Sequence, residues 1–176
     1  MEILIREMNA GESPQTKSFS RKSRVNSRLK LDIENEKLVY AIVPVDEPYE
    51  RDYAAEDVEY GFGDDNIAIF FAEIDGKPAG RIKMMKWWNR FGYVEDLVVD
   101  PEYRGLGVGR ILLERGIKWS RENHYPGVML ETQDNNVPAC KLYVSCGFVL
   151  GGFDRNVYKA INPNTKEIAL YWYLIF

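Results

Sequence analysis

The sequence is poor in the residue types that most metal sites and nucleophilic triads use. Its 176 residues include 1 histidine, His124, and 2 cysteines, Cys140 and Cys146. A zinc site or a Ser-His-Asp triad would therefore need an unusual set of side chains. The two cysteines lie within one predicted helix, at a spacing that suits neither a short disulfide nor a paired metal site. We expect reduced thiols and a chemistry that uses neither a metal nor a histidine triad.

Long apolar runs are also missing. No stretch approaches the roughly 18 apolar residues of a membrane-spanning helix. Residues 1–10 include Glu2, Arg6 and Glu7, where a secretory leader would be apolar. The chain contains no internal repeat and no linker rich in Gly, Ser or Pro. These absences predict a cytoplasmic protein with one domain and no membrane association.

Charge is unevenly distributed near the N-terminus. A basic stretch comprises Lys17, Arg21, Lys22, Arg24, Arg28 and Lys30. An acidic stretch comprises Asp46, Glu47, Glu50, Asp52, Glu56, Asp57, Glu59, Asp64 and Asp65. Each is consistent with a solvated face, and the acidic one also with an electrostatic funnel for a cationic small molecule. The formal net charge of −4 disfavours a nucleic-acid partner.

The apolar pattern predicts an α/β layer structure. Strand patterns cover residues 3–8, 37–45, 66–74, 79–88, 92–100, 127–133, 148–153 and 168–176. Asp75-Gly76 offers a tight turn between two of these strands, and we expect the strand at 37–45 to end by Pro48. Helices are predicted after Gly107 and after Asn136, the second ending at Gly147. The polar residues 10–30 are expected to be partly helical or loose, and the acidic stretch to hold a short helix.

The stretch YRGLGVGR, residues 103–110, joins a predicted strand to a predicted helix. The N–H groups at a helix N-terminus attract anions, and glycines allow phosphate oxygens to approach the backbone closely. Arg104 and Arg110 add formal positive charge at both ends of the stretch. The spacing fits neither the dinucleotide fingerprint GxGxxG nor the Walker pattern GxxxxGK[ST]. We therefore predict a pyrophosphate site of a different kind.

Two motifs carry a resemblance to a known family. Residues 104–109 match the R/QxxGxG/A pattern of the GNAT superfamily of acetyl-CoA-dependent N-acetyltransferases. The family's second pattern is matched by Asn136, Ala139, Tyr143, Gly147 and Phe148. The resemblance implies the GNAT acyltransferase fold, a mixed α/β (α+β) single domain with a central mixed sheet flanked by helices. It divides residues 1–176 into an acceptor-side part at 1–65, an acetyl-CoA-binding core at 66–150 and C-terminal strands at 151–176.

Longer stretches, including WNRFGYVEDLVVD and ALYWYLIF, resemble the streptothricin acetyltransferases. Those enzymes give antibiotic resistance by acetylating an amine of the β-lysine group of streptothricin. The resemblance implies a cationic small-molecule amine as substrate, with acetyl-CoA as cosubstrate and no metal. An aminoglycoside, a polyamine, an amino sugar phosphate or a peptide lysine remains an alternative acceptor, and a non-catalytic acetyl-CoA sensor an alternative function. A homodimer is compatible with the sequence.

The resemblance also implies where acetyl-CoA binds. Its pyrophosphate would lie on Arg104, Gly105, Leu106, Gly107, Val108, Gly109 and Arg110. Its pantetheine arm would pair with the strand edge at Leu97, Val98 and Val99, where a free N–H group would polarise the thioester carbonyl. Asn136 would hydrogen bond to the same arm, although an ordinary helix N-cap is the alternative.

Aminolysis of a thioester requires a deprotonated amine, because an alkylammonium cannot attack a carbonyl carbon. The candidate bases are Glu95, Asp96 and Glu131, acting directly or through water. Strand alternation predicts that Glu95 and Asp96 point to opposite faces, without deciding which face meets the substrate. Tyr143 is expected to be the acid that assists the leaving thiolate. Cys140 is expected to be buried filler, and transfer to be direct within a ternary complex.

Overall fold

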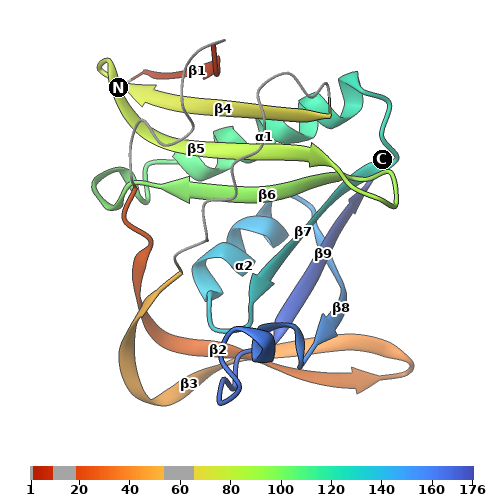
Figure 1. Ribbon diagram of the computed structural model, residues 1–176. Helices are drawn as coiled ribbons and strands as arrows, with labels where there is room; N and C mark the ends of the chain where they lie inside the picture. The colour runs from red at the N-terminus through yellow and green to blue at the C-terminus, as the bar shows by residue number, and fades with distance from the viewer. Residues whose placement is uncertain (1, 10–18, 54–65) are drawn as a thin grey trace. The chain divides into compact units, whose positions relative to one another are not determined.

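The computed structural model describes residues 2–9, 19–53 and 66–176 (Figure 1). Its strands are β1 (Ile3–Glu7), β2 (Lys22–Glu34), β3 (Lys37–Asp52), β4 (Ile67–Ile74), β5 (Lys77–Lys86), β6 (Gly92–Val99), β7 (Gly127–Gln133), β8 (Val149–Asp154) and β9 (Ala169–Ile175). Its helices are α1 (Val108–Glu122) and α2 (Val137–Ser145), with short 3-10 turns η1 (Pro101–Tyr103) and η2 (Val157–Ala160). The predicted α/β fold class is confirmed.

The chain divides into two compact units. The first comprises Met1–Lys22, Asp52–Val128 and Ile175–Phe176, and the second comprises Ser23–Arg51 and Met129–Leu174. In the first unit, strands β1, β4, β5 and β6 lie in that order, and each pair is antiparallel. The predicted hairpin at Asp75-Gly76 is confirmed, since both residues have positive φ, 50° and 73°, and Ile74 pairs with Lys77.

Helix α1 packs against β4, β5 and β6 and lies behind them in Figure 1. Its buried residues recur at helical spacing, and Leu112 and Leu113 are fully buried. Close packing depends on glycine: a Cβ at Gly80 would lie 2.7 Å from the Val98 carbonyl oxygen and 3.0 Å from Leu112. A Cβ at Gly116 would lie 2.7 Å from Met84 Sδ. The helix therefore covers the face of β5 that carries Gly80 and Met84.

The second unit contains β7, β9 and β8 in that order, helix α2 and the two-stranded ribbon β2-β3. Its core includes the fully buried Trp172, Leu130 and Leu170. Tyr40 of β3 meets Trp172 edge-on, with ring centroids 6.0 Å apart. The predicted end of α2 is confirmed, because Cys146 is its C-cap and Gly147 has a φ of 89°.

The ribbon corrects two predictions. Residues 22–34 form β2 rather than a helical or loose segment, because Val25 and Leu29 are buried in the second unit. β3 continues through Pro48 to Asp52 instead of ending, and residues 46–52 are therefore strand and not helix. Proline lacks an N–H group but is tolerated on the outer edge of a ribbon, where no partner strand needs that donor. The rest of the predicted acidic helix, residues 54–65, lies outside the described residues.

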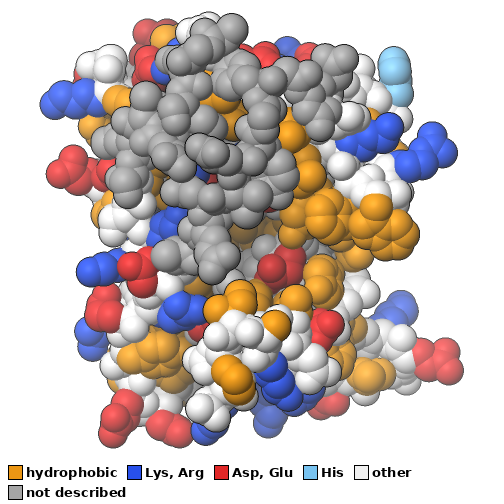
Figure 2. All heavy atoms as spheres, viewed as in Figure 1, with side chains coloured by type: hydrophobic (Ala, Val, Ile, Leu, Met, Phe, Trp, Pro, Cys, Tyr) orange, Lys and Arg blue, Asp and Glu red, His pale blue; other side chains and the backbone are white. Residues whose placement is uncertain are grey.

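Charges on the ribbon are interspersed rather than grouped by sign, as the lower part of Figure 2 shows. Arg24 of β2 pairs with Glu50 of β3, with 3.6 Å between Nη1 and Oε1 and both side chains exposed. This pairing favours a solvated face for the described part of the acidic stretch. In the described ranges 2–9, 19–53 and 66–176, no helix is long and apolar enough to cross a membrane.

Candidate functional site

The glycine-rich stretch forms the turn that leads from β6 and η1 into α1. Gly105 and Gly107 have φ of 77° and 87°, in the left-handed region that glycine adopts without strain. Gly107 is the N-cap of α1, and its carbonyl accepts from Ile111 N at 3.1 Å. A Cβ at either glycine would meet no described atom within 4 Å. The glycines are therefore required by backbone conformation, and the space beside them suits phosphate oxygens at a helix N-terminus.

The two arginines of this stretch have different surroundings. The Arg104 guanidinium donates to three carbonyl oxygens: Val99 at 3.2 Å, Lys22 at 2.8 Å and Ser20 at 3.0 Å. Arg110 Nη1 lies 3.9 Å from Glu114 Oε1, one turn further along α1. Arg104 thus ties residues 20–22 to the end of β6, while Arg110 lies on the exposed side of the helix N-terminus.

Glu95 and Asp96 point to the same face of the sheet, so the prediction of opposite faces is wrong. Asp96 pairs with Lys83 and Val94 with Met84, which leaves Glu95 as the extra residue of a β-bulge. A bulge interrupts the strict alternation of side chains. The Glu95 carboxylate lies 2.7 Å from Lys83 Nζ, and the Asp96 carboxylate lies 2.8 Å from Arg81 Nη2. Arg81 and Lys83 are two residues apart on β5 and share the face opposite α1.

Asp96 is held between two arginines, neither of which the sequence had suggested. Arg21 donates to both carboxylate oxygens, at 2.6 and 2.9 Å, and Arg81 Nη2 donates to Oδ2 at 2.8 Å. Burial raises the pKa of the Asp96 carboxyl, but the hydrogen bonds and charges of Arg21 and Arg81 outweigh it and hold the pKa below its ordinary value. The carboxylate therefore stays ionised and is a poor proton acceptor near neutral pH.

Glu131 lies on β7 in the second unit, and its surroundings raise its pKa where those of Asp96 lower it. Its Oε1 accepts a hydrogen bond from the Tyr158 hydroxyl on η2. Burial and the nearby charge of Glu167 raise the pKa of the Glu131 carboxyl to about 7. A carboxyl that titrates near neutral pH can both take up and release a proton under working conditions. Of the three predicted bases, Glu131 is the one whose pKa is raised toward neutral pH.

Helix α2 carries the remaining predicted site residues. Tyr143 is buried, with its ring centroid 6.1 Å from that of Phe148 and 6.3 Å from that of Trp172. Asn136 is the N-cap residue, but its side chain makes no capping hydrogen bond within the described part of the chain. Within the described part of the chain Cys140 and Cys146 form no disulfide, and burial raises the pKa of Cys140 to about 12. That thiol stays protonated and is no nucleophile, as predicted.

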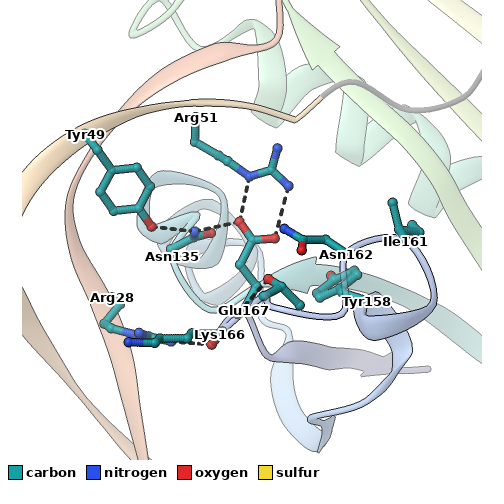
Figure 3. A pocket seen from close by; sticks show the side chains of 10 residues that line it. Arg28, Tyr49, Arg51, Asn135, Tyr158, Ile161, Asn162, Lys166 and Glu167 are labelled. Atoms are coloured by element: carbon teal, nitrogen blue, oxygen red, sulfur yellow. Dashed lines mark hydrogen bonds and ion pairs between the residues drawn. The ribbon is translucent and has the colours of Figure 1, made fainter.

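A pocket of about 490 Å³ lies in the second unit (Figure 3). It is lined by Arg28 and Arg51 of the ribbon, by Asn135 and by residues of the segment 158–167 between β8 and β9. Arg51 pairs with Glu167 through two contacts, Nε to Oε1 at 2.6 Å and Nη2 to Oε2 at 3.0 Å. Arg28 pairs with the fully buried Asp134. These residues carry no motif, and the paired groups lie about a hundred residues apart, so sequence reasoning missed them.

Comparisons with known proteins identify the same family as the two sequence motifs do. The profile described as "Acetyltransferase (GNAT) family" matches residues 31–148. The streptothricin acetyltransferase of Escherichia coli is 41% identical over 126 residues, which cover 72% of this chain and 70% of that protein. Streptothricin acetyltransferase A of Bacillus subtilis (strain 168) is 38% identical over 130 residues, covering 73% of this chain and 75% of that protein.

Two solved structures are similar along almost the whole chain. One is a Bacillus anthracis (strain Ames) protein assigned as a streptothricin acetyltransferase, in complex with acetyl coenzyme A. It has a TM-score of 0.90 and 40% identity, and covers 99% of this chain and 100% of that chain. The other is a nourseothricin acetyltransferase, with a TM-score of 0.80, 28% identity and coverage of 98% of each chain. The chain therefore belongs to the acetyltransferase (GNAT) family and is an acetyl-CoA-dependent acetyltransferase.

Proposed function

We propose that the protein acetylates an amine of streptothricin, on its β-lysine group, and so gives resistance to that antibiotic. The observation that carries this proposal is the 41% identity to a streptothricin acetyltransferase over most of both chains. Similarity extends over 99% of the chain to a structure assigned to the same activity. Because that structural match covers almost the whole chain at 40% identity, it takes in the acceptor-side part as well as the acetyl-CoA-binding core.

Acetyl-CoA supplies the acetyl group as a thioester. In the first unit, the N–H groups at the start of α1, from Gly107 to Arg110, are suited to its pyrophosphate. Support comes from the open space beside Gly105 and Gly107 and from the exposed position of Arg110. The three hydrogen bonds of Arg104 favour holding residues 20–22 over binding phosphate. Leu97 to Val99 on β6, and Asn136 on α2, remain the proposed contacts of the pantetheine arm.

The proposed general base is Glu131. A substrate ammonium loses its proton poorly near neutral pH, and a base with a pKa of about 7 is well matched to receive that proton. Tyr158 holds the Glu131 carboxyl by a hydrogen bond. Asp96 is less suited because two arginines hold it ionised, and the Glu95 carboxylate forms an ion pair with Lys83 at 2.7 Å. In this proposal Asp96 and Glu95 move no protons.

The proposed acid is Tyr143. Transfer is direct: the deprotonated amine nitrogen bonds to the carbonyl carbon, the carbon–sulfur bond breaks, the phenolic proton goes to the departing thiolate, and the proton that the attacking nitrogen then loses restores the phenol. No covalent enzyme intermediate is involved, which agrees with the raised pKa of the Cys140 thiol. Burial of Tyr143 between Phe148 and Trp172 fixes the direction of its hydroxyl, as an acid for one defined atom requires.

The test is thiol release from acetyl-CoA in the presence of streptothricin, an aminoglycoside, spermidine, glucosamine 6-phosphate or a lysine-containing peptide. We expect turnover chiefly with streptothricin, and mass spectrometry should find the acetyl group on its β-lysine group. Selective turnover of another acceptor would overturn the substrate assignment. Tyr143→Phe should lower kcat about a hundredfold or more, on the order expected for general acid catalysis, while leaving the Kd for acetyl-CoA nearly unchanged.

A further inference from the structure

The pocket of the second unit has the chemistry of a binding site for an uncharged polar ring. Its wall presents hydroxyl and amide groups from Tyr49, Asn135, Asn162 and Thr165, and aromatic surface from Tyr49 and Tyr158. Asn135 Nδ2 donates to the Tyr49 hydroxyl and to Glu167 Oε1, both at 3.0 Å, which fixes the orientation of these groups (Figure 3). A volume of about 490 Å³ accommodates a ring with substituents.

The charges of the residues that line the pocket disfavour a cationic guest. Arg28 is paired with Asp134, and Arg51 is paired with Glu167. Lys166 adds a third cation to the wall, so cations outnumber the carboxylates that neutralise them. An alkylammonium group placed there would meet like charge, which is unfavourable. The pocket is therefore unsuited to the amine that is acetylated and suited to a neutral, hydroxyl-bearing part of the same molecule.

The pocket is connected to the proposed base through one residue. Tyr158 lines the pocket, and its hydroxyl donates a hydrogen bond to the Glu131 carboxyl. The walls are anchored to β7, because Asp134 accepts from Ile168 N at 2.9 Å and its carbonyl accepts from Leu29 N at 2.8 Å. A ligand in the pocket would therefore lie on a fixed frame next to the group that holds Glu131.

We infer that this pocket binds the uncharged, hydroxylated portion of the acceptor, a sugar-like ring, while the reacting amine lies outside it. The inference rests on the proposed function for the identity of the acceptor. It assigns Tyr49 and Asn162 as specificity-determining residues that contact the acceptor away from the reacting amine. Binding energy from such a remote part of a substrate lowers KM and positions the reacting group.

The experiment compares two acceptors that share one amine. Streptothricin carries the whole acceptor, and β-lysine amide carries the amine without the rest. The variants are Tyr49→Phe and Asn162→Ser, and the serine oxygen can still accept the 3.1 Å hydrogen bond from Asn164 N that shapes this loop. Asn156→Ser is the matched control, because it makes the same change between β8 and β9 at a residue that does not line the pocket.

Each variant should raise KM for streptothricin about fivefold, as expected for one lost hydrogen bond. KM for β-lysine amide and for acetyl-CoA should change less than twofold, and the control should match wild type in all three. Unchanged streptothricin KM in both variants, or equal changes for both acceptors, would overturn the inference.

Binding of the acetylated product separates this inference from the proposed function. Product binding needs no turnover, and calorimetry with N-acetylated streptothricin should show the same fivefold weakening in the two variants. If wild-type protein binds this product but does not acetylate streptothricin, the proposed function is refuted, while the assignment of the pocket as a binding site stands. If wild-type protein acetylates streptothricin and the two variants bind the product normally, the role of the pocket in acceptor binding is refuted, while the proposed function stands. Failure of both turnover and product binding would refute both.

Discussion

Replacing Glu131 by glutamine should stabilise the protein, and the gain should grow with pH. The folded state raises the pKa of Glu131 from an ordinary 4.5 to about 7, chiefly through burial and then through the charge of Glu167. The folded protein thus holds this proton more tightly than the unfolded chain does. Stability is lost as pH rises from about 4.5 to above 7, because the unfolded chain ionises first. At about 1.4 kcal/mol per pKa unit, the loss reaches about 3 kcal/mol above pH 8.

Glutamine is isosteric and keeps an oxygen that accepts from Tyr158, but it never ionises. Urea unfolding of wild type and Glu131→Gln should therefore differ by less than about 1 kcal/mol near pH 4.5 and by about 3 kcal/mol at pH 8.5. Glu34→Gln is the matched control, since Glu34 is exposed on β2 of the same unit. A difference that does not change between the two pH values would refute the reasoning. If Glu131 is also the base, the same variant should lose turnover while gaining stability.

Three further outcomes follow from the first unit. Asp96→Asn should lower the free energy of unfolding by about 3 kcal/mol in urea titration, because it removes the negative charge that faces the buried Arg81 and the partly buried Arg21. Gly80→Ala should lower the melting temperature by several degrees, because its Cβ would lie 2.7 Å from a backbone oxygen of β6. Gly152→Ala is the control: its Cβ would meet no described atom within 4 Å, so the melting temperature should change little. Gly107→Val should abolish acetyl-CoA binding in calorimetry, because a β-branched residue is strained at a φ of 87°. Normal affinity in the valine variant would contradict the phosphate role of that turn.

Local sequence signals predicted most of the elements. Apolar alternation indicated the strands from β4 onward, and Asp75-Gly76 indicated the hairpin turn that the φ values confirm. The glycine-rich stretch predicted a strand-to-helix junction at the start of α1, and the positive φ of Gly105 and Gly107 was found only in the structure. Each of these signals lies within a few neighbouring residues. The prediction for residues 22–34 was wrong because the burial of Val25 and Leu29 depends on partners far along the chain.

The sequence by itself determined the family, the glycine turn and the set of candidate carboxylates, because each of these depends on residue type and short spacing. Only the tertiary structure decided what each carboxylate can do. The bulge at Glu95 brings two acids to one face, where Arg21 and Arg81 keep Asp96 ionised. Burial beside Glu167 brings the Glu131 pKa to about 7. Proton affinity depends on the solvent and charges around a group, and distant segments of the chain supply those only after folding.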